Sequence, residues 1–170
     1  MPGRVRGLRP GRARARTHAR LTSHEAGATE YIDADLRDTD TILAQAARLL
    51  DFAKPVAVTL LMILHVIPDS DDPHAIVAKV MDALPPGSYL AVSHLGSELL
   101  DGKAKQGFDD IVSRRAQQQY ISRNREQMAR FFAGMDLVES GLVRVEEWRP
   151  DPGAGETGRS ARWCALGRKR

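Results

Sequence analysis

The sequence predicts an α/β domain built on a mostly parallel sheet. Apolar runs that end at aspartate or histidine alternate with helical segments that have one apolar face, in the order strand–helix–strand–helix–strand–helix–hairpin. The run Val56–Ile67 (VAVTLLMILHVI) is continuously apolar, rich in β-branched and aliphatic residues, and flanked by prolines. This pattern is typical of a strand buried on both faces of a parallel sheet, although the length also permits a buried helix.

The size and composition are those of a soluble globular protein. A chain of 170 residues can form one domain with a real core, and it is 42% hydrophobic and 28% charged. It has no apolar run of about eighteen residues, so we expect no membrane span. The single cysteine, Cys164, cannot form an intramolecular disulfide, which suits a reducing cytoplasm. No Cys/His cluster has the spacing of zinc ligands, and we expect no metal.

Residues 1–20 differ in composition from the remainder of the chain. They contain seven arginines and no acidic residue, and without them the formal net charge falls from +3 to −4. Arginines can bind nucleic acid through its phosphates, but this segment has no aromatic residue and no apolar core of a secretory signal. We expect a disordered tail over residues 1–20 and a domain over 21–170, with a nucleic-acid arm as the less favoured alternative.

The first predicted strand is Thr29–Ile32, which ends at a series of aspartates that includes Asp33 and Asp35. The segment DTDTILAQAARLLDF follows as a helix, with Asp38 or Asp40 as its N-cap. Its predicted inward face consists of Ile42, Ala46, Leu49 and Leu50.

After Val56–Ile67, the segment PDSDDPHAIVAKVMDALPPGS predicts a second helix. Asp72 is a good N-cap, and Pro73 occupies the first helical position, where its missing N–H costs nothing. The segment SYLAVSHL then predicts another strand. The predicted buried face of the helix consists of Ile76, Val77, Val80, Met81 and Leu84.

The C-terminal third contains two predicted helices and a hairpin. DDIVSRRAQQQYIS predicts a polar helix, and RNREQMARFFAGM predicts a helix with Met128, Phe131 and Phe132 inward and Gly134 at its C-cap. LVESGLVRVEEW and RWCALGRKR predict two closing strands, which the loop RPDPGAGETGRSA joins as a long hairpin.

In open parallel sheets, ligands bind beyond the carboxyl ends of the strands, which here are residues 33–38, 65–69 and 93–96. If the backbone stays extended, Asp33 and Asp35 point to the same side and can accept hydrogen bonds from a ribose or an adenine amino group. The alternative for these aspartates is a polar turn that caps the next helix.

His65 follows the apolar run and is the candidate general base, because the pKa of histidine lies near neutrality. The alternative is a histidine at the solvent edge that is satisfied by Asp69 or by a backbone carbonyl. Adjacent strand residues point to opposite faces, so Ser93 and His94 are not expected to pair as a nucleophile and its base.

Three long blocks carry a resemblance to a known family. These are YIDADLRDTDTILAQAARLLDFAKPVAV, LLMILHVIPDSDDPHAIVAKVMDALPPGSYLAVSH and EEWRPD. They closely resemble the bacterial S-adenosyl methyltransferase family that was formerly a domain of unknown function, within the class I methyltransferases. The resemblance covers roughly residues 20–170.

The resemblance implies a Rossmann-like sheet with strand order 3-2-1-4-5-7-6 and an antiparallel last strand. Thr29–Ile32 would be strand 3, Val56–Leu64 strand 4 and Ser88–Ser93 strand 5, with the hairpin as strands 6 and 7. Strands 1 and 2, with their glycine-rich loop, have no counterpart in the sequence, so the expected sheet is partial and holds strands 3 to 7. We interpret this gap as a truncated or frame-shifted start, which reading the upstream coding DNA in all frames would test.

The resemblance also implies S-adenosylmethionine as cofactor. Asp35 with Leu36 is the best match to the adenine-side position, and Asp33 is the second. Met62, Leu64 and their neighbours would line the methionine part of the cofactor, where His65 is the candidate base by analogy with some O-methyltransferases.

The expected function is methyl transfer from S-adenosylmethionine to a small-molecule acceptor by an in-line displacement. The chain can also be an inactive fragment of such an enzyme. The alternative class is a non-enzymatic α/β remnant that acts in assembly or binding. It could form a homo-oligomer, or its arginine-rich arm could contact nucleic acid.

Overall fold

The computed structural model describes residues 30–100, 102, 105–107, 120–153 and 160–170. The chain divides into two compact units, residues 1–31 and 32–170. The second unit holds the sheet and the candidate site. The expected tail over residues 1–20 lies outside the described residues.

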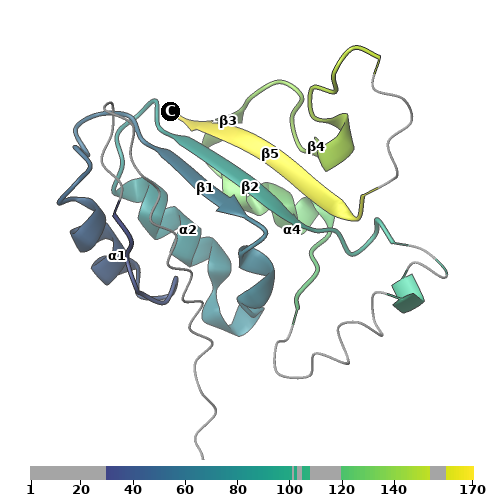
Figure 1. Ribbon diagram of the computed structural model, residues 1–170, viewed down its shortest axis with the longest axis horizontal. Coiled ribbons are helices and arrows are strands. Elements are labelled where there is room, and N and C mark those ends of the chain that lie inside the picture. The colour runs from purple at the N-terminus through teal and green to yellow at the C-terminus, as the bar shows by residue number, and fades with distance from the viewer. Residues whose placement is uncertain (1–29, 101, 103–104, 108–119, 154–159) are drawn as a thin grey trace, which may run out of the picture. The chain divides into compact units, whose positions relative to one another are not determined.

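A mixed sheet forms the centre of the second unit, with strand order β1-β2-β5-β3. β1 (Ala57–Leu61) is parallel to β2 (Tyr89–Leu95), and β5 (Arg162–Lys169) is antiparallel to β2 and to β3 (Met135–Leu137). β4 (Val143–Arg144) also pairs with β5 (Figure 1). β1, β2 and β3 therefore run in one direction and β5 in the other. This arrangement confirms the order 4-5-7-6 and the antiparallel last strand that the resemblance implies.

Two helical segments cover one face of this sheet. α2 (Pro73–Asp82) and α4 (Arg125–Ala129), which a 3₁₀ turn at Arg130–Phe132 extends, lie along β2 and β5 (Figure 1). Apolar side chains from both sides meet there and are almost fully removed from water, which is the main source of folding free energy. The core residues are Val77, Met81, Leu84, Met128, Phe131 and Phe132 from the helical side, and Leu90, Val92, Trp163 and Ala165 from the sheet.

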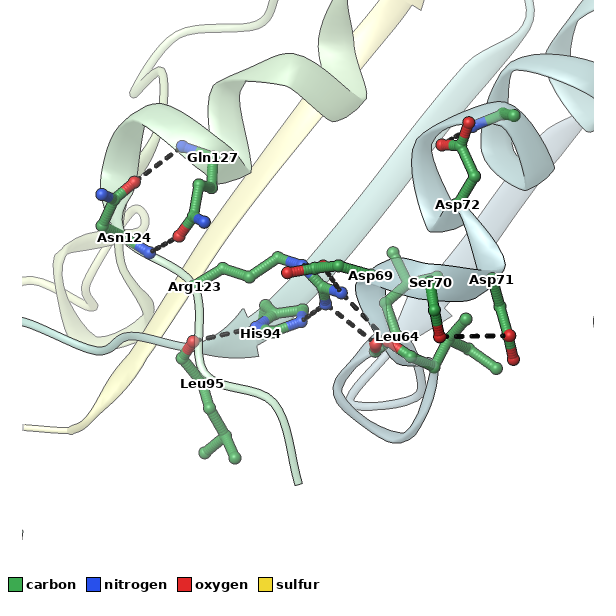
Figure 2. A network of polar contacts seen from close by, with 12 residues as sticks. Leu64, Asp69, Ser70, Asp71, Asp72, His94, Leu95, Arg123, Asn124 and Gln127 are labelled. Carbon is green, nitrogen blue, oxygen red and sulfur yellow. Dashed lines mark hydrogen bonds and ion pairs between the residues drawn. The ribbon is translucent and has the colours of Figure 1, made fainter. Parts of the chain in front are cut away.

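The predicted helix starts are confirmed. The carboxylate of Asp72 accepts a hydrogen bond from the Ala75 N–H (3.0 Å) at the start of α2, and Asp38 does the same for the Thr41 N–H (3.2 Å) at the start of α1 (Thr39–Ala46). α4 begins at a reciprocal capping box in which Asn124 and Gln127 each bond the other's backbone N–H (Figure 2).

A glycine permits close packing between α4 and the sheet. A Cβ atom on Gly167 of β5 would lie 2.7 Å from the ring of Phe132, which is shorter than any ordinary contact. The absence of a side chain therefore lets the aromatic ring lie directly on the strand.

Two expectations about the first helix and β1 are wrong. α1 ends at Ala46, and Leu49 and Leu50 are 41% and 43% exposed, because no described element covers them. Val56–Ile67 is not a strand buried on both faces. Only Ala57–Leu61 is a strand, its burial alternates, and Leu61 is 61% exposed, because the described residues cover only one of its faces and pair only one of its edges.

The strand expected at Thr29–Ile32 is also not found in its described part, since residues 30–34 have no regular secondary structure and residue 29 lies outside the described residues. A strand persists only when a neighbour bonds its N–H and C=O groups, and the described sheet offers these residues no ladder partner. Exposure still alternates over residues 31–36, so Asp33 and Asp35 lie on one side, as expected.

The loop after β1 contains two 3₁₀ turns, Leu64–Val66 and Asp69–Asp71, and a third lies at Val145–Glu147. Most of the helix predicted at 109–122 lies outside the described residues, and residues 120–122 are not helical. No helix in the described part of the chain has the length and apolar character that a membrane crossing requires.

We predict that Lys169→Met destabilises the protein by about 1–2 kcal/mol in a urea denaturation series. The Lys169 ammonium donates to the carbonyls of Met81 (2.8 Å) and Leu84 (2.7 Å), so it satisfies the C-terminal end of α2 from the last strand. The control Lys54→Met removes an exposed ion pair with Asp51 and should change stability by less than about 0.5 kcal/mol. Equal losses in the two variants would contradict the capping role.

Candidate functional site

The candidate site lies where β1 and β2 end, and a buried arginine lies at its centre. Arg123 is 0% exposed. Its backbone runs beside the end of β2, since the Arg123 N–H donates to the Leu95 carbonyl (3.0 Å) and the Arg123 carbonyl accepts from the Ser97 N–H (3.2 Å). These two bonds aim the side chain back under the loop that follows β1 (Figure 2).

The guanidinium of Arg123 bonds four different groups. It donates to the carbonyls of Leu64 (3.0 Å) and Ile67 (3.0 Å) and to one carboxylate oxygen of Asp69 (2.6 and 3.2 Å). The remaining N–H donates to Nε2 of His94 (2.6 Å; Figure 2). All five N–H groups of the side chain are used, as burial of a charged group requires.

This contact fixes the protonation state of His94, which is 0% exposed. Its Nδ1 lies 2.8 Å from the Leu95 carbonyl, so Nδ1 carries the proton and Nε2 is free to accept from Arg123. Burial, with a smaller contribution from the positive charge of Arg123, lowers the pKa of His94 to about 4. His94 is therefore a neutral acceptor at pH 7.

His65 lies next to this cluster and is 8% exposed. Its ring stacks on Tyr120 with centroids 5.1 Å apart and planes at 13°, and its carbonyl accepts from the Ile121 N–H (2.7 Å). Burial and then the charge of Arg123 lower the pKa of His65, so the imidazole is neutral at pH 7. A neutral imidazole is the form that can accept a proton.

The solvent-edge position and the Asp69 partner of the alternative for His65 do not fit the structure. The residue is buried rather than at the solvent edge, and Asp69 bonds Arg123 instead. Within the described ranges, the buried Nδ1 of His65 has no hydrogen-bond partner.

The two other residues expected on the methionine side have different environments. Met62 turns the chain after β1 with φ of 51°, and its N–H donates to both the carbonyl (3.0 Å) and the hydroxyl (3.1 Å) of Ser93. The Leu64 side chain is 0% exposed in the core, so its polar contribution to the site is its carbonyl. Ser93 and His94 point to opposite faces of the sheet, as predicted.

The aspartates before α1 lie close to the loop after β1. Arg37 bonds Asp35 through its backbone N–H (3.0 Å), Nε (2.9 Å) and Nη2 (2.7 Å), and its Nη1 donates to Asp71 (2.7 Å). Leu36 packs against the core cluster. The carboxylate of Asp33 is exposed and forms no hydrogen bond or ion pair with other described residues, so it has more acceptor capacity than Asp35.

Arg37 and Arg123 together link residues 33–38, the loop after β1 and the end of β2. Arg37 links residues 33–38 to Asp71, and Arg123 links residues 64–69 to His94. The aspartates of this loop all have structural partners, since Asp69 bonds Arg123, Asp71 bonds Arg37 and Asp72 caps α2. In the part of the chain that the structure describes, no group of three or more His, Cys, Asp or Glu could hold a metal ion.

No sequence pattern indicates the roles of Arg123 and Tyr120. Arg123 is one of 25 lysines and arginines, it precedes a predicted helix start, and nothing in its spacing marks it as buried. Its one local signal is the pair of polar neighbours in Ser122–Asn124, which is typical of a helix N-terminus rather than a buried ion pair.

The face of the sheet opposite α2 and α4 carries an apolar groove of about 390 Å³. Residues of β1, β2 and β5 form its floor, and Val145 and Trp148 form one wall. The floor residues are Leu61, Ala91, Val92, Ser93, Arg162, Cys164, Ala165 and Leu166.

We predict that the free energy of unfolding falls as the pH is lowered from about 6.5 to about 4. The pKa of His94 is lower in the native state than in the unfolded state, so the unfolded state binds more protons between pH 6.5 and pH 4. The stabilisation that is fully present above pH 6.5 is therefore lost as the pH falls. The contribution of His94 is at most about 3 kcal/mol. His94→Gln keeps an acceptor for Arg123 but does not titrate, so urea denaturation at several pH values should give a flatter profile. Parallel profiles for the two proteins would contradict the assignment.

The sequence profile of a family described as S-adenosyl methyltransferase matches residues 13–170. Among solved structures, a DUF574 family protein from Streptomyces avermitilis is 34% identical with a TM-score of 0.80. The match covers 88% of this chain and 58% of the Streptomyces chain. A putative methyltransferase from Thermobifida fusca is 32% identical with a TM-score of 0.69. The match covers 81% of this chain and 52% of the Thermobifida chain. No curated protein matches the chain.

A methyltransferase from Anabaena variabilis, described as dependent on S-adenosylmethionine, has a TM-score of 0.51 at 10% identity, so it shares the fold. The chain spans just over half the length of the Streptomyces and Thermobifida proteins. The family profile nevertheless matches nearly all of it, over the elements that build the sheet and the strand-end site. The chain belongs to the S-adenosyl methyltransferase family.

Proposed function

We propose that this chain is the C-terminal part of a methyltransferase domain and that its strand-end segments contact S-adenosylmethionine. One observation carries the proposal. Arg37 links residues 33–38 to Asp71 in the loop after β1, and Arg123 links residues 64–69 of the same loop to His94 near the carboxyl end of β2. Ligands bind at this edge in open α/β sheets, and the family's cofactor is S-adenosylmethionine.

Several side chains at this edge fit such a ligand. Asp33 has a free carboxylate for the adenosine side, whereas Asp35 would have to share its oxygens with Arg37. Met62 and His65 lie on the loop assigned to the methionine side, and the unpartnered Nδ1 of His65 is a buried polar atom that the described residues leave unsatisfied. When bound, the cofactor would supply an activated methyl group.

We assign His65 the role of base toward a small-molecule acceptor. Two observations support this role. Burial and the charge of Arg123 keep the imidazole of His65 neutral, and stacking against Tyr120 fixes the orientation of its ring. A neutral imidazole at this place can take the proton of an acceptor hydroxyl or amine as the methyl group is transferred.

We predict that calorimetry with S-adenosylhomocysteine detects binding to this chain. Asp33→Asn should weaken the affinity about 5–10-fold, which is the loss expected when one charge-assisted hydrogen bond becomes a neutral one. Asp82→Asn is the matched control, because Asp82 is an exposed aspartate on α2. An unchanged affinity in Asp33→Asn would remove Asp33 from the proposed site, and no heat with the parent chain would contradict cofactor binding altogether.

The groove on the second sheet face favours a second candidate function, assembly with another copy of this chain. Leu61, Ile63 and Val145 are large apolar residues at 61%, 39% and 38% exposure. β1 pairs only with β2 among the described strands, and its sequence AVTLL has no charge. Antiparallel pairing of β1 with its copy would therefore oppose no like charges and would satisfy free backbone groups.

Analytical ultracentrifugation tests this candidate. We predict a concentration-dependent dimer that Leu61→Asp weakens at least 10-fold, because a carboxylate would be buried at the pairing edge. Leu137→Asp, at an exposed leucine on β3, is the control and should leave the dimer unchanged. A monomer at all concentrations would exclude self-assembly through β1.

A further inference from the structure

We propose that Arg123 is the positioning residue of the site: it fixes the loop Leu64–Asp69 and thereby sets where the ring of His65 lies, without contacting a ligand. This inference rests on the proposed function, because His65 is the candidate base there. It is nevertheless a statement about the free protein, so it can be tested before any ligand binds.

Arg123 is an arginine at a candidate site, and such residues commonly bind anionic ligands. Here the geometry excludes that role. The side chain is 0% exposed, and each of its five N–H groups already has an acceptor within 3.2 Å. A ligand anion could bind only by displacing Asp69 or a backbone carbonyl, so the bonds of Arg123 serve the protein itself.

The bonds of Arg123 lie on both sides of His65 in the sequence. The guanidinium holds the carbonyl of Leu64, one residue before (Figure 2). It also holds the carbonyl of Ile67, two residues after. The carbonyl of His65 itself accepts from the Ile121 N–H (2.7 Å). Ile121 and Arg123 therefore hold the backbone at His65 and on both sides of it, through the carbonyls of residues 64, 65 and 67.

The same segment supports the ring of His65. Tyr120 lies three residues before Arg123 and stacks on the imidazole with centroids 5.1 Å apart. The ring of His94 lies on another side of the His65 ring, with centroids 6.3 Å apart and planes nearly perpendicular. Arg123 holds His94 through its Nε2 atom. Displacing the guanidinium would thus release the backbone of His65 and one neighbour of its ring together.

Lysine cannot replace this arginine. An ammonium group is a compact point charge with three donors, whereas the planar fork of a guanidinium reaches two carbonyls, a carboxylate and an imidazole at once. Arg123→Lys keeps the positive charge near His65 but loses the geometry. A role that depended on charge alone would survive this substitution, and a positioning role would not.

The test compares Arg123→Lys with Arg130→Lys, a control at an exposed arginine of the neighbouring turn that pairs with Glu126. Nuclear magnetic resonance of the folded proteins reports the ring protons of His65, which the stacked Tyr120 ring shifts. Calorimetry reports the affinity for S-adenosylhomocysteine. In Arg123→Lys we expect the Tyr120-induced shift of His65 to be lost and the affinity to fall at least 10-fold, with both unchanged in the control.

Folded Arg123→Lys with unchanged His65 resonances and an affinity within twofold of the parent would overturn the inference. If Arg123→Lys does not fold, Asp69→Asn decides instead, because it leaves the guanidinium in place and weakens one of its contacts. It should move the His65 resonances and weaken binding at least threefold, and no change in either would again overturn the inference. If the parent chain does not bind S-adenosylhomocysteine, the proposed function fails, while the His65 resonances still decide the role of Arg123.

Discussion

Burying an arginine is costly unless every N–H finds an acceptor, and this requirement organises one end of the sheet. The guanidinium of Arg123 bonds two carbonyls and a carboxylate of the loop after β1 and the imidazole of His94 on β2. The loop after β1 makes two of these contacts with its backbone, so the arginine adds to the hydrogen bonds of the loop's own 3₁₀ turns. His94 must stay neutral for the same reason, since a protonated imidazole could not accept from a cation.

The parts of the fold that could be predicted depend on local chemistry. Asp38 and Asp72 cap their helices where their spacing indicated, and Met128 and Phe131 face the core as helical periodicity required. The strand order was available only through the family resemblance, because nothing in the sequence of β5 shows that it inserts between β2 and β3.

The parts that could not be predicted depend on distant partners. Leu49 and Leu50 have the spacing of an inward face, yet burial needs a second surface, which the described residues do not provide. The site shows the same limit. His65 was identifiable as a histidine after an apolar run, whereas Arg123 lies 58 positions further along the chain, and the contact between its guanidinium and the backbone before and after His65 leaves no periodic trace in the sequence.

The position of β5 in the sheet has a consequence for how the protein folds. β5 lies between β2 and β3, and each of its seven ladder pairs with β2 joins residues more than sixty positions apart. β1 and β2 can pair early, but the other edge of β2 stays open until residues 162–168 arrive. Such non-local closure slows folding and leaves an apolar strand edge exposed in the meantime. A chain in which only β1 and β2 had paired would expose this edge, so the docking of β5 is the step at which aggregation would compete with folding.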